Sequence, residues 1–170
     1  MDLYVIILRL VHLFANAFWA GTVFFFALFL LPRVKQAGPL GSQFMQRLTQ
    51  PPLTETISIA AALAALSGIL LYWRVSAGIQ WAWVQTSTGF AFTISGLAGI
   101  GAAAIGILVS RPTASRMGSL GKQIAAAGGQ ASASQMADMQ VLAARLERAL
   151  HQTAYLLILS LAGMAVARYL

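Results

Sequence analysis

The first hydrophobic stretch, residues 3–31, contains the side chains best placed to do chemistry. If this stretch is a helix, residues spaced three and four apart share one face. That face carries Arg9, His12, Asn16, Trp19 and Val23. The other faces are Leu, Ile, Val and Phe, and a membrane span with one polar stripe turns that stripe toward protein and away from lipid. We therefore expect His12 to point into a bundle of helices.

The chain has 2 histidines, and a four-helix membrane protein with two histidines invites the hypothesis of a b-type haem held by both. Their depths argue against this arrangement. His12 lies roughly 4.5 Å of helix rise from Arg9, whereas His151 lies roughly 25 Å from Arg168, and both arginines belong to the same side of the membrane. We therefore expect the two histidines near opposite faces of the bilayer, too far apart to hold one haem.

Met164 is a better candidate than His151 for a second ligand beside His12. Met164 lies four residues before Arg168 and His12 lies three residues after Arg9, so the two side chains are expected at nearly the same depth. An imidazole and a thioether together suit a haem iron or Cu(I), both of which accept soft sulfur. The alternative is structural: Met164 packs between helices, and His12 satisfies its ring nitrogens by hydrogen bonding. The candidate haem or copper ligands are thus His12 and Met164, with no cofactor as the other interpretation.

Arg9 and Asn16 lie about one helical turn to either side of His12. Together they could bind an anionic group, such as a haem propionate or a lipid phosphate, or Arg9 could simply extend to the outer headgroups. The predicted spans hold no Asp or Glu, so a carboxylate proton relay is not expected. Phosphate loops and the common hydrolase motifs are missing as well, which excludes soluble-type enzymology and leaves open whether the chain is an enzyme.

A family resemblance is carried by the stretch Arg9-Leu-Val-His12-Leu-Phe-Ala-Asn-Ala-Phe-Trp19-Ala-Gly21 and the later Leu31-Pro32-Arg33. This stretch resembles the first helix of small bacterial membrane proteins of the copper-resistance D type and of the HemJ-like protoporphyrinogen oxidases. The resemblance implies a four-helix, haem-associated membrane protein in which His12 is a cofactor or metal position. The HemJ-like pattern also includes an intramembrane Lys that the later spans lack, so the resemblance implies a site and not a reaction.

Composition places the chain among integral membrane proteins, since 59% of its 170 residues are hydrophobic, 9% are charged and the mean hydropathy is +0.76. The chain has no Cys, which excludes disulfides and thiolate sites. The excess of 11 Lys and Arg over 4 Asp and Glu is explained by membrane topology, so no nucleic-acid partner is expected. Asp2 stands where a signal peptide would be basic, so the first span is expected to be retained.

Four stretches approach the ~20 residues that a helix needs to cross a bilayer: 3–31, 57–73, 88–109 and 152–169. The connections 33–55 and 110–151 hold Arg33, Lys35, Arg47, Arg111, Arg116, Lys122, Arg145 and Arg148. The positive-inside rule places both connections in the cytoplasm and both termini outside, in a bacterial inner membrane. A belt of aromatic residues agrees with this orientation: Tyr4, Tyr72, Trp73, Trp81, Trp83 and Tyr169 all fall at the proposed outer interface.

The second connection has structure of its own. Residues 114–127 favour a helix, Gly128-Gly129 would break it, and Ser132-Ala-Ser-Gln135 resembles a capping box that starts an amphipathic cytoplasmic helix before the last span. A faint repeat also relates the two connections. Pro32, Gly38, Leu40, Gly41 and Gln43 recur at a constant offset as Pro112, Gly118, Leu120, Gly121 and Gln123. The chain could therefore be two parallel helix pairs.

The expected fold is an all-α, single-domain bundle of four membrane spans over residues 1–170. The third span is rich in Gly, Ala and Ser, which predicts close helix packing and a face left over for a second copy or a larger complex. Two functions remain. In the first, His12 helps to bind b-type haem or copper for redox or cofactor handling. In the second, the chain is a non-catalytic accessory subunit of a membrane complex.

Overall fold

The computed structural model describes residues 2–170, except for the side chains of Pro39 and Gln46. Every regular element in that range is a helix. Four helical runs are long and apolar enough to cross a membrane: Leu3–Gln36, Leu53–Val75, Ser87–Ala126 and Ala133–Ala167. The predicted all-α class and the four candidate spans are confirmed.

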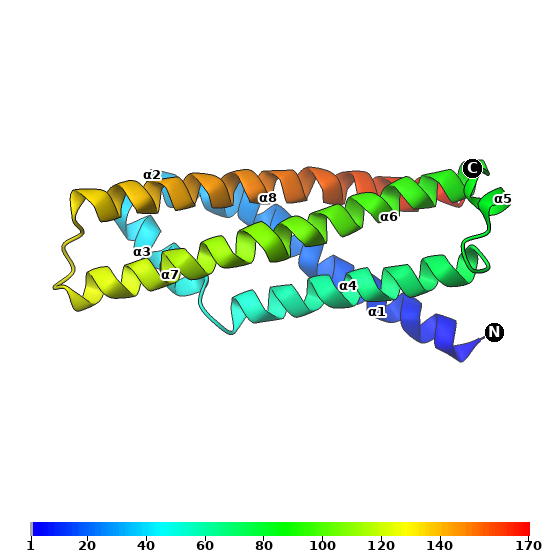
Figure 1. Cartoon of the computed structure of the whole chain (residues 1–170), viewed down its shortest axis with the longest axis horizontal. Coiled ribbons are helices and arrows are strands. Elements are labelled where there is room, and N and C mark those ends of the chain that lie inside the picture. Colours follow the sequence, from blue (N-terminus) through cyan, green and yellow to red (C-terminus); the bar gives the residue numbers. More distant parts are fainter. Residues whose placement is uncertain (1) are drawn as a thin grey trace.

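The helices run alternately in opposite directions along one long axis (Figure 1). Their order is α1 (Leu3–Phe24), the π-helical η1 (Phe25–Leu30), α2 (Leu31–Gln36), α3 (Gly38–Leu48), α4 (Leu53–Val75), α5 (Trp81–Val84), α6 (Ser87–Ile105), the π-helical η2 (Gly106–Ser110), α7 (Arg111–Ala126) and α8 (Ala133–Ala167). Both termini and α5 lie at one end, which we call the terminal end. The opposite end, with α3 and the α7–α8 turn, is called the basic end.

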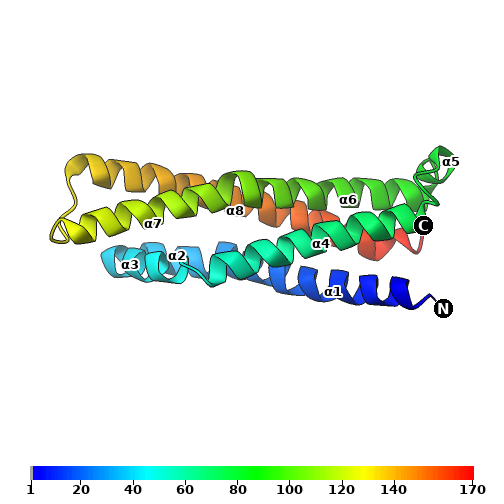
Figure 2. The ribbon, with the colours of Figure 1, turned by 60° about the horizontal axis from the view of Figure 1, so that its bottom comes forward.

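The bundle is built from two antiparallel helix pairs. Helix α1 packs most extensively against α4, and α6 packs most extensively against α8, with smaller interfaces between α4 and α6 and between α1 and α8. Figure 2 shows α1 beside α4 and α6 beside α8 along most of their length. The space between the pairs is therefore where a cavity can form.

The first helical run does not end at residue 31, the predicted end of the first span, but continues past Pro32 to Gln36. A proline inside an α-helix clashes with the carbonyl four residues earlier. Here a π-helical turn precedes the proline, and the N–H of Leu31 donates to the carbonyl of Phe26. The extra residue in that turn lets the chain pass Pro32 and remain helical.

A π-helical turn before a proline also occurs in the second helix pair, in agreement with the sequence repeat. The N–H of Arg111 donates to the carbonyl of Gly106 in η2, directly before Pro112, so α6, η2 and α7 form one helical run. The third helix thus extends well into the predicted connection. The offset between the two π-helical turns equals the offset of the repeated prolines, and it also relates the buried residues Ala15 and Ser95. These matches agree with the hypothesis that the two helix pairs are parallel repeats of one another.

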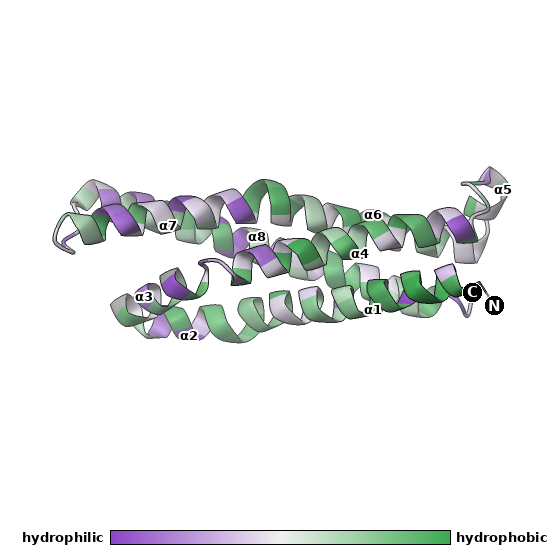
Figure 3. Ribbon diagram, turned by 90° about the horizontal axis from the view of Figure 1, so that it is seen from below, coloured by the Kyte–Doolittle hydropathy of each residue, from purple (hydrophilic) through white to green (hydrophobic). Residues whose placement is uncertain are grey.

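The basic end carries most of the hydrophilic sequence, as Figure 3 shows for α2, α3 and α7. Helix α7 ends before Gly128 and Gly129, whose φ angles of 91° and 81° favour glycine. The predicted capping box is confirmed: Ser132 Oγ accepts from the N–H of Gln135, and Gln135 Oε1 accepts from the N–H of Ser132. Helix α8 then runs without interruption into the last span, as predicted.

Small residues bring α6 and α8 close together. A Cβ atom added at Gly99 would lie 3.0 Å from Ser160 Oγ, and one added at Gly163 would lie 2.0 Å from Ser95 Oγ. Close packing is therefore the role of these glycines. Close packing was also expected at Gly96 and Gly106, but an added Cβ at either position would meet nothing within 4 Å. Each of these two glycines lines a cavity instead.

Candidate cofactor site around His12

A cavity of 490 Å³ lies between the two helix pairs, in the half of the bundle nearer the terminal end. We call it the outer cavity. Small-molecule sites in proteins span about 300–1,000 Å³, so its size is that of a ligand site. The four residues singled out from the sequence all line it: Arg9, His12, Asn16 and Met164. Folding thus brings α1 and α8 to the same cavity, as the matched depths of His12 and Met164 predicted.

The ring of His12 is held by α4. Its Nδ1 lies 2.9 Å from the carbonyl oxygen of Ala64 and 3.2 Å from Ser67 Oγ. A carbonyl oxygen only accepts, so Nδ1 carries the proton and donates to Ala64. Nε2 is then the unprotonated nitrogen, and the side-chain amide of Asn16 lies 3.3 Å from it. A ring nitrogen that donates to a backbone carbonyl while the other stays unprotonated is the arrangement that orients histidine ligands of metals.

Asn16 holds the same residue from one turn further along α1. Its Nδ2 donates to the backbone carbonyl of His12 at 2.8 Å and lies 3.3 Å from both ring nitrogens. A group equally distant from both nitrogens is off the axis of the Nε2 lone pair. Asn16 therefore restrains the imidazole, and a ligand bound at Nε2 would replace its 3.3 Å contact with that nitrogen.

Gly68 provides the surface on which the imidazole lies. A Cβ atom at that position would be 2.8 Å from Cε1 and 3.3 Å from Nδ1 of His12. The sequence identified His12 but missed the residues of α4 that hold it, which are Ala64, Ser67 and Gly68. The only signal for them was the small-residue run in the second span, and such a run does not say which of its members faces a given side chain.

Aromatic residues from three elements form a wall of the outer cavity near the terminal end. Thr93 Oγ1 donates to the carbonyl of Gly89 at 2.7 Å, so it accepts a hydrogen bond, also 2.7 Å long, from the hydroxyl of Tyr72. The Trp83 ring packs edge-on against Tyr72, with centroids 5.5 Å apart, and stacks on Phe92 at 6.4 Å. The sequence assigned Tyr72 and Trp83 to an interfacial belt, and the structure also places both in the cavity lining.

The remaining two predicted residues lie at the border of the outer cavity. Arg9 is exposed, and its guanidinium has no hydrogen bond or ion pair to another described residue. It is therefore free to bind an anionic group at the cavity mouth. Met164 is half-buried and contributes its thioether side chain from α8.

These residues fit a haem-type cofactor better than a copper ion. A haem needs an axial ligand, apolar flat walls and cations for its propionates. The outer cavity offers Nε2 of His12, the aromatic wall, the open surface at Gly96 and the guanidinium of Arg9. A copper ion would depend on His12 and Met164 alone, because residues 2–170 contain no cluster of three or more His, Cys, Asp or Glu able to hold a metal.

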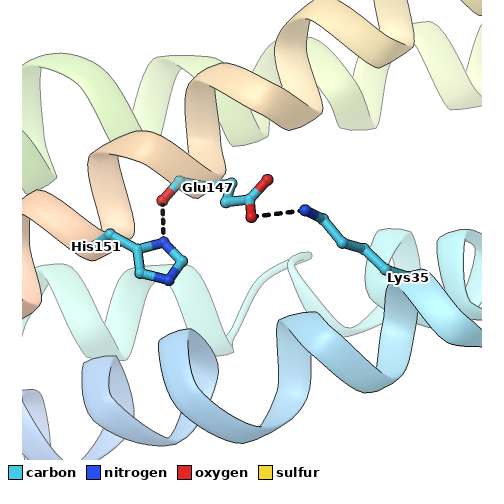
Figure 4. Close-up of polar contacts among 3 residues, drawn as sticks. All are labelled: Lys35, Glu147 and His151. Atoms are coloured by element: carbon cyan, nitrogen blue, oxygen red, sulfur yellow. Dashed lines mark hydrogen bonds and ion pairs between the residues drawn. The ribbon is translucent and has the colours of Figure 1, made fainter.

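His151 lies apart from this site, as predicted. Its Nδ1 donates to the carbonyl of Glu147 at 2.9 Å, and the Glu147 carboxylate pairs with Lys35 of α2 at 2.6 Å (Figure 4). His151 does not occur among the described residues that line the outer cavity. One haem held by both histidines of a chain is therefore incompatible with the fold.

Three comparisons with known proteins were negative. No family model, curated protein or solved structure matches the chain. The resemblance of the first helix therefore rests on its own residues, and the site on its own geometry.

Proposed function

We propose that the chain is an integral protein of the bacterial inner membrane that binds b-type haem in the outer cavity, where His12 would hold the haem iron, and that it acts in redox or cofactor handling. The observation that carries the proposal is the hydrogen bond from His12 Nδ1 to the carbonyl of Ala64, which leaves Nε2 unprotonated in a residue that lines a cavity of 490 Å³. In this proposal the basic end lies in the cytoplasm and both termini lie outside.

Each of the other residues predicted from the sequence would help to hold the haem. Met164 would supply a second, softer ligand, and Arg9 would pair with a propionate of the haem. Asn16 keeps the imidazole of His12 in place through the backbone carbonyl. Bound haem would supply one-electron redox chemistry, and the enclosing aromatic residues would limit the access of water to it. The resemblance of the first helix to haem-associated membrane proteins agrees with this assignment.

The test is a haem titration of the purified protein in detergent, followed through the Soret band. We expect wild-type protein to bind haem with a shifted Soret band, His12→Ala to lose most of that binding, and His151→Ala to retain it. The His151 variant is the matched control, because it removes an imidazole from the same bundle at a place away from the outer cavity. Equal loss in both variants, or a wild-type protein without a shifted band, would contradict the proposal; the second result would favour the accessory-subunit alternative.

A further inference from the structure

A second cavity, of 110 Å³, lies toward the basic end, and we call it the inner cavity. Its lining comes from α1, α3, α4, α7, α8 and both π-helical turns, and most of its surface is apolar. The close-packed core, which includes Ala102, Ala103, Ala154 and Leu157, separates it from the outer cavity. An apolar cavity of about 150 Å³ binds benzene, so the inner cavity has room for a few carbon atoms of a ligand.

The inner cavity reaches the surface of the bundle beside Arg111. Ile107 and Arg111 lie four residues apart, and both are exposed while both line the cavity. The third span is predicted from its hydropathy to end at residue 109. In the proposed orientation, the opening therefore lies at the level of the lipid headgroups on the cytoplasmic side of the membrane.

One hydroxyl in this lining lacks a partner. The hydroxyls of Thr22, Ser58 and Thr153, which also line the cavity, each donate to the carbonyl four residues earlier in the same helix. Ser110 lies in η2, where the backbone hydrogen bonds span five residues instead of four. Its Oγ is buried and has no hydrogen-bond partner in the described part of the chain. Burying a hydroxyl without a partner costs free energy, so we expect an acceptor from outside the chain.

Arg111 supplies a positive charge at the opening of the inner cavity. Its guanidinium makes no hydrogen bond or ion pair to another described residue. The connections 33–55 and 110–151 hold eight Lys and Arg against three Asp and Glu, and Lys35–Glu147 is the one ion pair in the described part of the basic end. A basic pocket between membrane helices on the cytoplasmic side is typical of a site for an anionic lipid headgroup.

From these observations we infer that the inner cavity binds an acyl chain of an anionic phospholipid, whose phosphate lies on the guanidinium of Arg111. A phospholipid has its parts in the order that the site requires: a phosphate at the membrane surface, an ester carbonyl below it, and an apolar acyl chain deeper still. The ester carbonyl accepts from Ser110 Oγ, which turns toward the cavity by rotation about one bond. The acyl chain then passes Ile107 and lies against Gly106, where an added Cβ would meet nothing within 4 Å. No residue assigned to the haem takes part, so the inference does not depend on bound haem.

Fluorescence quenching by a brominated acyl chain tests the occupant. Trp19 lines the inner cavity and is only 3% exposed, so lipid around the bundle quenches it to a low and common background. The assay uses haem-free protein carrying Trp73→Phe, Trp81→Phe and Trp83→Phe, reconstituted in phosphatidylcholine vesicles. We expect phosphatidylglycerol brominated near the ester to quench Trp19 several-fold more than phosphatidylcholine brominated at the same carbons. Equal quenching by the two lipids would refute a site for an anionic lipid.

Two substitutions at the opening test how the lipid is held. Arg111→Gln should abolish the preference for phosphatidylglycerol. Arg116→Gln is the matched control and should keep it, because Arg116 is exposed on the same helix and is not among the described residues that line the inner cavity. Ser110→Ala should raise the mole fraction of phosphatidylglycerol needed for half-maximal quenching roughly 2- to 10-fold, the contribution of one hydrogen bond. Unchanged quenching in Arg111→Gln, or in Ser110→Ala, would refute the assigned position of the headgroup.

Filling the inner cavity tests the place of the acyl chain. Gly106→Leu should remove the preferential quenching, and Gly106→Ala replaces it if the larger substitution loses helical circular dichroism. Gly21→Leu is the matched control, since an added Cβ at Gly21 also meets nothing within 4 Å but that residue is exposed on α1. Preferential quenching that persists in a folded Gly106 variant would place the acyl chain elsewhere and refute the inference.

A free phosphate ion shares the chemistry of the headgroup, so it needs its own test. Inorganic phosphate in millimolar excess should leave the preferential quenching of Trp19 unchanged, because the ion lacks the acyl chain that fills the inner cavity. If inorganic phosphate removes the preference, Arg111 belongs to a site for the free ion, and the lipid assignment is wrong.

Discussion

The imidazole of His12 and the backbone of Gly68 are in direct contact, and only the absence of a side chain at position 68 allows it. A Cβ there would lie 2.8 Å from Cε1 of the ring. The position of His12 is thus set by two features of α4, a carbonyl that accepts from Nδ1 and a glycine that leaves room for the ring.

Gly68→Ala should therefore displace the imidazole without removing it. Because partners that orient a metal-binding histidine contribute about 10- to 100-fold to affinity, we expect a loss of that order in haem binding, measured by Soret titration. Gly21→Ala is the control, since an added Cβ at Gly21 meets nothing within 4 Å and that residue is exposed on α1. Unchanged affinity in Gly68→Ala would show that the ring position does not matter for the cofactor.

The orientation of the bundle can be tested at its two ends. Gln80, beside α5, and Gln130, in the turn between α7 and α8, are both exposed and lie at opposite ends. We expect a cysteine at position 80 to react with an impermeant maleimide in intact cells whose outer membrane has been permeabilised, and one at position 130 to react only after lysis. The reverse pattern would place the basic end outside and contradict the positive-inside argument.

The ion pair between Lys35 and Glu147 joins α2 to α8 but should add little stability. Its N–O distance is 2.6 Å, yet the Lys35 side chain is 60% exposed and that of Glu147 31% exposed. Exposed pairs contribute about 0.2–1 kcal/mol. A double-mutant cycle with Lys35→Met and Glu147→Gln, measured as the free energy of unfolding in mixed micelles, should give a coupling energy below about 1 kcal/mol. A coupling well above that value would mean that the pair is effectively buried in the native protein.

The parts of this fold that could be predicted from sequence are those encoded within one helix. Apolar length gave the four spans, the spacing of His12 and Asn16 gave their shared face, and Ser132 with Gln135 gave the start of α8. The repeated prolines indicated two related helix pairs. Each of these signals depends on residues that are close in the chain, so hydrophobicity and capping rules apply directly.

The parts that could not be predicted depend on contacts between helices. The structure places Gly68, and not Gly96, under the ring of His12. The sequence could not distinguish the two glycines, because both lie in runs of small residues and differ only in which side chain packs against them. The π-helical turns were missed because they leave no compositional signature before Pro32 and Pro112. The second role of Trp83 was missed because an interfacial aromatic and a cavity-lining aromatic have the same composition signal.

Gly163 of α8 lies against Ser95 of α6, and this close approach provides a test of the α6–α8 interface. A Cβ at position 163 would lie 2.0 Å from Ser95 Oγ and 3.3 Å from Ser95 Cβ, while Ser95 Oγ is held by a 2.6 Å hydrogen bond to the carbonyl of Ala91. Overpacking a core typically costs about 1–3 kcal/mol. We expect Gly163→Ala to lower the free energy of unfolding in mixed micelles by an amount in that range.

Removing the obstructing atoms should reverse most of that loss. Ser95→Gly deletes the two atoms that the new methyl group would crowd and leaves only an ordinary contact with the carbonyl oxygen of Ala91. The double variant Ser95→Gly, Gly163→Ala should therefore be more stable than Gly163→Ala alone, with a favourable coupling energy of about 1 kcal/mol or more. Pairing Ser95→Gly with Gly21→Ala should give no such coupling, because Gly21 is exposed on α1 and far from Ser95 in the chain. If the two substitutions at positions 95 and 163 are simply additive, α6 and α8 do not approach each other there, and the register of the whole α6–α8 pair would have to be redrawn.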